Sequence, residues 1–184
     1  LSPSKLGGAK ALPGEGGQDT ALAMARGDRL HRLLEHLPNH DPAQWGPVAT
    51  ALAAEDVLEE ARLVITRQPA LFAPGTLAEV AVTAEVGGRR MLGSIDRLIL
   101  SADRVLAVDF KSNKVVPRRA EEVPEGILRQ MGAYAVALGQ IYPGRRIETA
   151  ILWTQDATLL HLDPDIVSAA LASALPIDVA TPTA

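Results

Sequence analysis

Two acids and one lysine in the middle of the chain have a spacing suited to metal-assisted hydrolysis of a phosphodiester. Asp109 lies thirteen positions after Asp96, and Lys111 follows Asp109 by two positions. Side chains two apart on a strand point to the same side of the sheet, so Asp109 and Lys111 can converge on one point. If Asp96 lies on the neighbouring antiparallel strand, two carboxylates and an ammonium share a site that can hold a divalent cation and a water molecule.

The strand that carries Asp109 is apolar on both faces over residues 105–110, which predicts a central, buried strand. A buried carboxylate without a partner costs several kcal/mol or becomes protonated. Plain ion pairs are one solution, with Asp96 joined to Arg97 and Asp109 to Lys111. The other is Mg²⁺, which prefers about six oxygen ligands and takes only one or two protein carboxylates. The residues themselves leave both readings open.

Length and composition predict one compact domain with few special features. The chain has 184 residues, of which 47% are apolar, enough for one good core. Its net charge of −4 gives no bulk attraction to nucleic acid, and the absence of cysteine excludes disulfides, thiolate zinc sites and iron–sulfur clusters. There is no apolar run of membrane-helix length and no signal pattern, so we expect a cytoplasmic protein without membrane contact. The start at Leu1 and the lack of a phosphate-binding loop suggest a piece of something larger.

The elements that must position these residues follow from periodicity and turn chemistry. We expect a flexible, glycine-rich linker over 1–19, a domain over 20–174 and a C-terminal tail over 175–184. The patterns predict a mixed sheet between helices, an α/β domain, with the following elements. They are helices over 20–37, from Asp41 toward Thr66, over 125–141 and over 164–174, a three-stranded meander over 77–85, 90–100 and 104–110, and a strand pair over 147–153 and 158–162.

Three motifs occur in order along the predicted sheet and the helix after it. They are Gly93-Ser-Ile-Asp96, Asp109-Phe-Lys111-Ser112 and Gln130-Met-Gly-Ala-Tyr134. Together they resemble the RecB-type branch of the PD-(D/E)XK nucleases, and Gly27 to His31 resembles the G-x-x-x-H helix upstream of the core in that branch. The resemblance spans about residues 27–153 and implies a restriction-endonuclease-like fold, a mixed sheet flanked by helices.

A narrower resemblance concerns the AddA-type helicase–nucleases, the enzymes that resect double-strand breaks for recombination and repair. The segments 1–4, 123–130 and 142–144 are similar to the C-terminal nuclease domain of that family. The resemblance implies a helicase region in the same polypeptide and an AddB-like partner subunit. AddB-type subunits carry a four-cysteine iron–sulfur cluster, so a chain without cysteine resembles AddA rather than AddB.

The resemblance implies a role for each matching residue. Mg²⁺, or Mn²⁺ in its place, would bind to Asp96, Asp109, the backbone carbonyl of Phe110 and His31. Lys111 would organise the attacking water. Gln130 and Tyr134, four apart on one helical face, would turn toward the site, and Glu79 resembles an acid that some relatives add to it. The plainer alternatives are that His31 packs among leucines, that Lys111 only pairs with Asp109, and that Tyr134 packs on the sheet.

The expected function is that of a Mg²⁺-dependent exodeoxyribonuclease acting on single strands of DNA that a helicase has unwound. Two alternatives stay open. One is a DNA-binding or scaffolding domain that keeps the nuclease fold without cleaving. The other is a metal-dependent ribonuclease or junction resolvase on the same fold.

Overall fold

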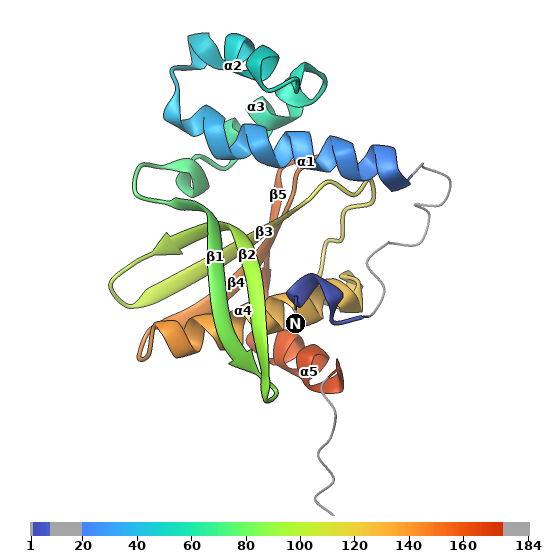
Figure 1. The fold of residues 1–184 in the computed structure, drawn as a ribbon, viewed down its shortest axis with the longest axis vertical. Helices are drawn as coiled ribbons and strands as arrows, with labels where there is room; N and C mark the ends of the chain where they lie inside the picture. Colours follow the sequence, from blue (N-terminus) through green and yellow to red (C-terminus); the bar gives the residue numbers. More distant parts are fainter. Residues whose placement is uncertain (1, 8–19, 175–184) are drawn as a thin grey trace, which may run out of the picture.

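The computed structural model describes residues 2–7 and 20–174, and it places a five-stranded sheet between two sets of helices (Figure 1). The strands lie side by side in chain order, and neighbours are antiparallel except for the parallel pair β3–β4. They are β1 (Leu77–Val86), β2 (Arg89–Leu100), β3 (Arg104–Lys111), β4 (Arg146–Trp153) and β5 (Thr158–Leu162). The predicted meander, strand pair and mixed sheet are confirmed.

Two glycines close the long hairpin between β1 and β2. Gly87 and Gly88 have φ angles of 55° and 69°, in the left-handed region that a two-residue hairpin turn needs at both positions. The register then runs without slip from Val86↔Arg89 down to Leu77↔Leu98. This hairpin therefore fixes which residue of β1 lies across from each residue of β2.

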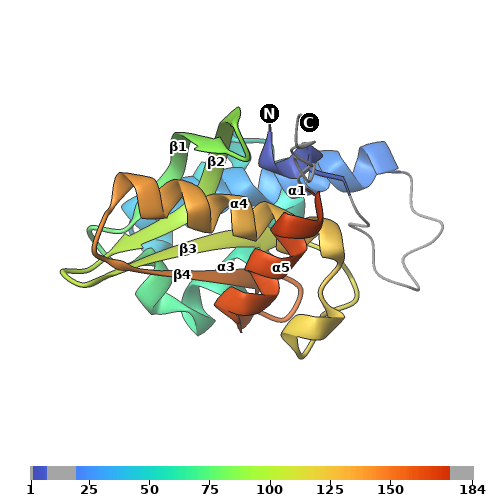
Figure 2. The same cartoon turned by 90° about the horizontal axis from the view of Figure 1, so that it is seen from below.

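One face of the sheet is covered by α4 (Glu125–Ile141) and α5 (Pro164–Ala174), which lie side by side in Figure 2. A parallel strand pair requires a crossover connection, and α4 supplies it between β3 and β4. Both helices have the bounds expected from the sequence. The crossover brings the motif that contains Gln130 and Tyr134 onto the sheet.

The other face is covered by α1 (Thr20–His36), α2 (Trp45–Ala51) and α3 (Leu58–Arg67), which form the upper part of Figure 1. Strand β3 separates the two cores by alternation. Val105 and Ala107 belong to the core under α4 and α5, while Leu106, Val108 and Phe110 belong to the core under α1, α2 and α3. All six residues of 105–110 are buried, so the prediction of a central strand is confirmed.

The prediction of one helix from Asp41 toward Thr66 is wrong. Asp41 does cap a helical turn, because its side chain accepts the N–H of Ala43, but this is a short 3-10 turn, Pro42–Gln44. The chain then forms α2 and reverses at Ala53, which has a φ of 50°, before a second 3-10 turn, Glu55–Val57, leads into α3. A straight helix of this length would extend roughly 39 Å and leave the core, whereas the reversal buries apolar residues of both α2 and α3 against α1 and the sheet.

Residues 2–7 fall within the segment that we expected to be a linker. Here they form a 3-10 turn, Pro3–Lys5, that packs against α4 and β2, and the side chain of Pro3 is buried. The rest of the expected linker, 8–19, and the expected tail, 175–184, lie outside the described residues. Over 2–7 and 20–174, none of the helices combines the length and the apolar character needed to cross a bilayer.

Candidate active site

The sheet forks between β2 and β3 at the two acids. The strands pair from Leu100↔Val105 to Arg97↔Val108, and one further step of this register sets Asp96 opposite Asp109. Beyond that step β2 continues along β1, while β3 continues along β4 to Lys111↔Trp153. The structure thus places both carboxylates at the point where a central pair of strands separates.

The carboxylate of Asp96 bridges the fork. Its Oδ2 accepts the backbone N–H of Phe110 at 2.5 Å, and its Oδ1 lies 3.4 Å from Nδ1 of His31. Because the N–H and C=O of one strand residue point toward the same neighbouring strand, the carbonyl of Phe110 also faces the fork. Asp96 is not paired with Arg97, whose guanidinium donates to the carbonyl of Leu34 at 2.7 Å and is buried on the α1 side.

His31 reaches this carboxylate from α1. Gly27 lies one turn earlier, and a Cβ there would be 3.5 Å from Oγ of Ser112, so the helix and the end of β3 are in contact at that point. The imidazole also packs edge-on to the ring of Phe110, with 5.6 Å between ring centroids. Burial acts to lower the pKa of His31, but the hydrogen bond and negative charge of Asp96 outweigh it, and the pKa lies above its ordinary value.

Glu79 of β1 enters the same cluster. It lies across from Asp96, between the pairs Ala78↔Arg97 and Val80↔Ile95, and its φ of 49° is in the left-handed region. Such a conformation costs a non-glycine residue on the order of 1–3 kcal/mol and is found preferentially at functional sites. Oγ of Ser94 donates to its Oε2 at 3.2 Å, and burial together with the charge of Asp96 raises the pKa of Glu79.

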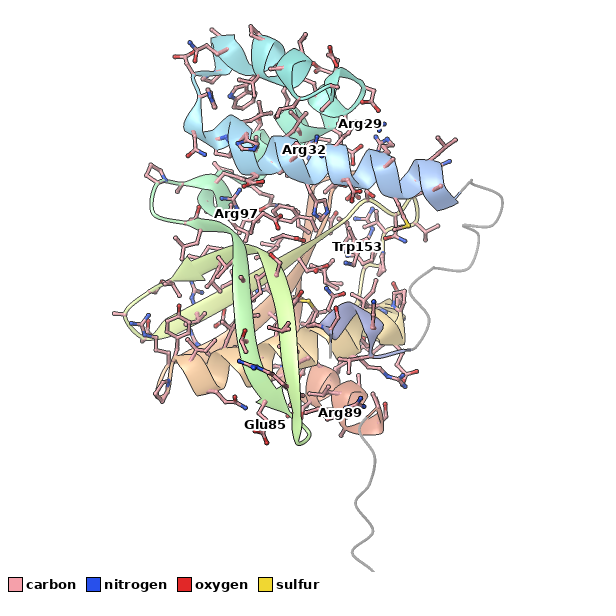
Figure 3. The ribbon with its side chains drawn as sticks, viewed as in Figure 1. Arg29, Arg32, Glu85, Arg89, Arg97 and Trp153 are labelled. Atoms are coloured by element: carbon pink, nitrogen blue, oxygen red, sulfur yellow. The ribbon has the colours of Figure 1, made fainter. Side chains whose placement is uncertain are left out.

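His31, Glu79 and Asp96 each offer one ligand atom, and these atoms lie within 4.8 Å of one another. Two carboxylate oxygens and an imidazole nitrogen suit a hard or borderline divalent cation. Asp28, Arg32 and Glu35 line a hollow beside this cluster, on the stripe of α1 that carries His31 (Figure 3 labels Arg32). The only sequence signal for these three residues is their helical spacing around His31.

Asp109 belongs to a second, buried set of contacts. Its Oδ1 accepts from Nε2 of Gln130 at 2.8 Å, and its Oδ2 forms a salt bridge with Nζ of Lys111. Burial raises the pKa of Asp109, and the charge of Lys111 partly offsets that effect. Burial acts to lower the pKa of Lys111, but the charge and hydrogen bond of Asp109 outweigh this effect. The pKa of Lys111 therefore lies above its ordinary value, and the amine stays protonated. The structure therefore brings Asp109 beside the three-ligand cluster rather than into it.

A hydrogen-bonded chain runs from Asp109 through α4 back to β2. Gln130 also contacts the hydroxyl of Tyr134 at 3.3 Å, and that hydroxyl donates to the carbonyl of Ser94 at 2.5 Å. Burial and the charge of Asp109 raise the pKa of Tyr134, so the phenol remains a neutral donor. Tyr134 thus holds the backbone two residues before Asp96, which is more than packing on the sheet.

Gly93 is the point where this chain meets the N-terminal segment. A Cβ on Gly93 would lie 2.8 Å from Cγ of Pro3 and 3.0 Å from Cε1 of Tyr134. The glycine of the Gly93-Ser-Ile-Asp96 motif is therefore required by close packing. Pro3 had no signal in the sequence beyond its place in a short motif at the start of the chain.

Comparisons with known proteins identify the family and the fold of the chain. The model of the PD-(D/E)XK nuclease superfamily matches residues 6–178. No curated protein matches the sequence. The chain is similar to the crystal structure of a proposed exonuclease from Eubacterium rectale, with a TM-score of 0.54 and 14% identity over 86% of this chain and 65% of that one. It also aligns with the crystal structure of SSO0001, at 12% identity over 84% of this chain and 86% of that one, but the TM-score of 0.36 is too low to support an argument.

At such identities the structural likeness concerns the fold alone, and it agrees with the restriction-endonuclease-like α/β architecture expected from the sequence. The family match covers most of the chain, including the fork, α1 and α4. This chain belongs to the PD-(D/E)XK nuclease superfamily.

Proposed function

We propose that this domain is a Mg²⁺-dependent exodeoxyribonuclease. The observation that carries the proposal is the fork in the sheet, which sets a three-ligand cluster of His31, Glu79 and Asp96 directly beside the Asp109–Lys111 pair. Hard oxygen ligands and a protonated amine at one point are what phosphodiester hydrolysis needs to offset the charge that develops in its transition state.

The donor set fits a divalent cation, because two carboxylate oxygens and an imidazole nitrogen lie within 4.8 Å of one another. His31, Glu79 and Asp96, with the carbonyl of Phe110, would hold the ion. Each carboxylate oxygen has two acceptor positions, so Asp109 retains capacity to join them. A bound Mg²⁺ would supply Lewis acidity toward a phosphate oxygen and toward water.

The protonated amine of Lys111 supplies the hydrogen-bond donor and the positive charge that phosphodiester hydrolysis needs. Asp109 and Gln130 fix the amine beside the fork, where it donates to the attacking water or to a nonbridging phosphate oxygen. Tyr134 orients Gln130 and holds the strand that carries Asp96. In this arrangement Asp109 and Gln130 position Lys111, in addition to any bond that Asp109 makes to the cation.

The wider context is also a proposal. The segments 1–4, 123–130 and 142–144 and the absence of cysteine support an AddA-type helicase–nuclease that degrades unwound single strands during repair of double-strand breaks. The partners would be a helicase region of the same polypeptide, an AddB-like subunit and DNA. The described part of the chain contributes the nuclease module of such an enzyme.

The test is cleavage of end-labelled linear single-stranded DNA by this chain, with Mg²⁺ and with EDTA. We expect metal-dependent cleavage that falls at least about 100-fold in Asp96→Asn and Lys111→Met, because ligand and amine act as one unit. Asp103→Asn, which neutralises an exposed acid in the turn between β2 and β3, is the matched control and should cleave like the wild type. Equal residual activity in all four proteins would reject the proposal.

The same assay separates the alternatives. Duplex DNA, RNA and a four-way junction, tested beside single strands, rank the substrates. A scaffold that keeps the fold would show neither cleavage nor a heat of Mn²⁺ binding that depends on Asp96.

A further inference from the structure

A second hollow opens on α1, where the helix meets the end of β3. It is lined by Ala23, Arg26, Ser112, Lys114 and Gln155, and its volume is about 170 Å³. The lining holds two cationic side chains and two neutral hydrogen-bond donors, and no acid is part of it. We propose that this hollow binds the phosphodiester that is adjacent, in the same DNA strand, to the one that is cleaved. The inference rests on the proposed function.

The position of the hollow supports this role. Ser112 directly follows Lys111, so the hollow begins where the proposed catalytic strand ends. Arg26 and His31 are five residues apart on α1, a rise of about 7.5 Å along the helix axis and a rotation of about 140° around it. Their side chains therefore leave different sides of the helix, and the end of β3 lies between them, because Gly27 of the same helix approaches Ser112. A strand that crosses the end of β3 can place one phosphate at the cation and a neighbouring phosphate in the hollow.

The two hollows along α1 differ in charge. The hollow at His31 contains Asp28, Glu35 and Glu79 and one arginine, which favours a cation. The hollow at Ser112 contains Arg26 and Lys114, which favours an anion. Helix α1 thus contributes to two hollows of opposite charge, one on each side of the end of β3.

The donors of the second hollow are available. Arg26 is held by a salt bridge with Glu60, but a guanidinium has five N–H donors and only part of them faces that carboxylate. No ion pair engages Lys114 within 2–7 and 20–174, so its ammonium is free to contact a phosphate. Contacts of this kind position the strand and carry no base preference.

The first measurement is binding of a fluorescent single-stranded oligonucleotide in EDTA, where no cleavage occurs, at several salt concentrations. We expect Lys114→Ala to weaken binding about threefold to tenfold at low salt and to reduce the slope of log K against log salt by about 0.7, the effect of losing one phosphate contact. Lys114→Arg should restore both. Arg89→Ala removes one exposed charge at the far end of the β1–β2 hairpin, distant from α1 in Figure 3, and should change neither quantity by as much.

The second measurement locates the phosphate. Neutral methylphosphonates are placed one at a time around the bond that the wild type cuts in Mg²⁺. A methylphosphonate at one position adjacent to the cut should slow cleavage by the wild type severalfold. It should have little effect on cleavage by Lys114→Ala, because the neutral phosphate and the lost lysine remove the same contact.

The outcomes are distinguishable. If the wild type binds and cuts DNA but Lys114→Ala binds with the same affinity and salt slope, the subsite is wrong and the proposed function stands. A wild type that neither binds nor cuts would overturn both.

Discussion

The carboxylate of Asp96 accepts the backbone N–H of Phe110 at 2.5 Å, and this contact joins β2 to β3 at the last step before the strands separate. The same carboxylate offers its other oxygen to the cluster with His31 and Glu79. Asp96 therefore has a structural role, as an acceptor for a buried backbone donor, and a chemical role, as an anionic ligand. Substitutions can separate the two.

Asp96→Asn keeps an acceptor for the N–H of Phe110 but removes the charge, whereas Asp96→Ala removes both. We expect Asp96→Asn without metal to be as stable as the wild type or more stable, because like charges no longer crowd the fork. Asp96→Ala should lose about 1–3 kcal/mol, the cost of an unsatisfied buried donor. Urea unfolding in EDTA measures the free energy of unfolding of both variants. Equal values for Asp96→Asn and Asp96→Ala would mean that the hydrogen bond to Phe110 contributes little to stability.

Divalent metal should stabilise the folded chain, because the ligand cluster is assembled only in the folded state. At a free Mn²⁺ concentration of 100 times its Kd, the gain is about 2.7 kcal/mol, or a rise in Tm of roughly 5–11 °C for a domain of this size. Thermal scans with Mn²⁺ and with EDTA measure the shift. Asp103→Asn should keep it and Asp96→Asn should lose it; a shift of the same size in both variants would place the metal elsewhere.

Tyr134 should make stability sensitive to alkaline pH. Burial raises its pKa above the value of 10.0 that the unfolded chain retains, so the contribution of the phenol to stability is complete below pH 10. Above pH 10 the unfolded state loses its proton while the folded state keeps it, and stability falls as pH rises toward the folded pKa. Tyr134→Phe cannot titrate and should lose less stability between pH 8 and pH 10.5.

Urea unfolding at the two pH values tests this difference. At pH 8 the Tyr134→Phe protein should already be about 1–3 kcal/mol less stable, because the carbonyl of Ser94 loses its donor. Parallel losses in both proteins as pH rises would show that other groups dominate the alkaline transition.

Gly93→Ala should destabilise the domain by about 1–3 kcal/mol, because the new methyl group overlaps Pro3 and presses on Tyr134. Pro3→Ala removes the nearer atom, so the double variant should recover part of the loss. Gly139→Ala in α4 is the matched control: nothing lies within 4 Å of a Cβ there, and the change should stabilise by about 0.5–1 kcal/mol. Denaturant midpoints of these four variants and the wild type test this prediction, and a Gly93→Ala midpoint equal to that of the wild type would contradict the close packing at Gly93.

Local patterns in the sequence were sufficient to predict the elements of the sheet, because alternation and turn residues act over a few positions. The strand that carries Asp109 and Lys111, the glycine turn at 87–88 and the helix that carries Gln130 and Tyr134 all lie where the sequence predicts them. The break between α2 and α3 was not predictable in this way. No proline or glycine marks Ala53, and the reversal depends on burying two short helices against α1.

The sequence by itself determined which side of its strand each acid and the lysine occupy, because a strand has a fixed period of two. Only the tertiary structure decided how far apart these groups lie across elements. Four features depend on contacts between segments that are distant in the chain. They are the fork between β2 and β3, the left-handed backbone of Glu79, the packing of Pro3 against Gly93 and the cationic hollow beside Ser112. Such distances are set by the packing of side chains from different elements, so the spacing of residues along a single strand or helix cannot predict them.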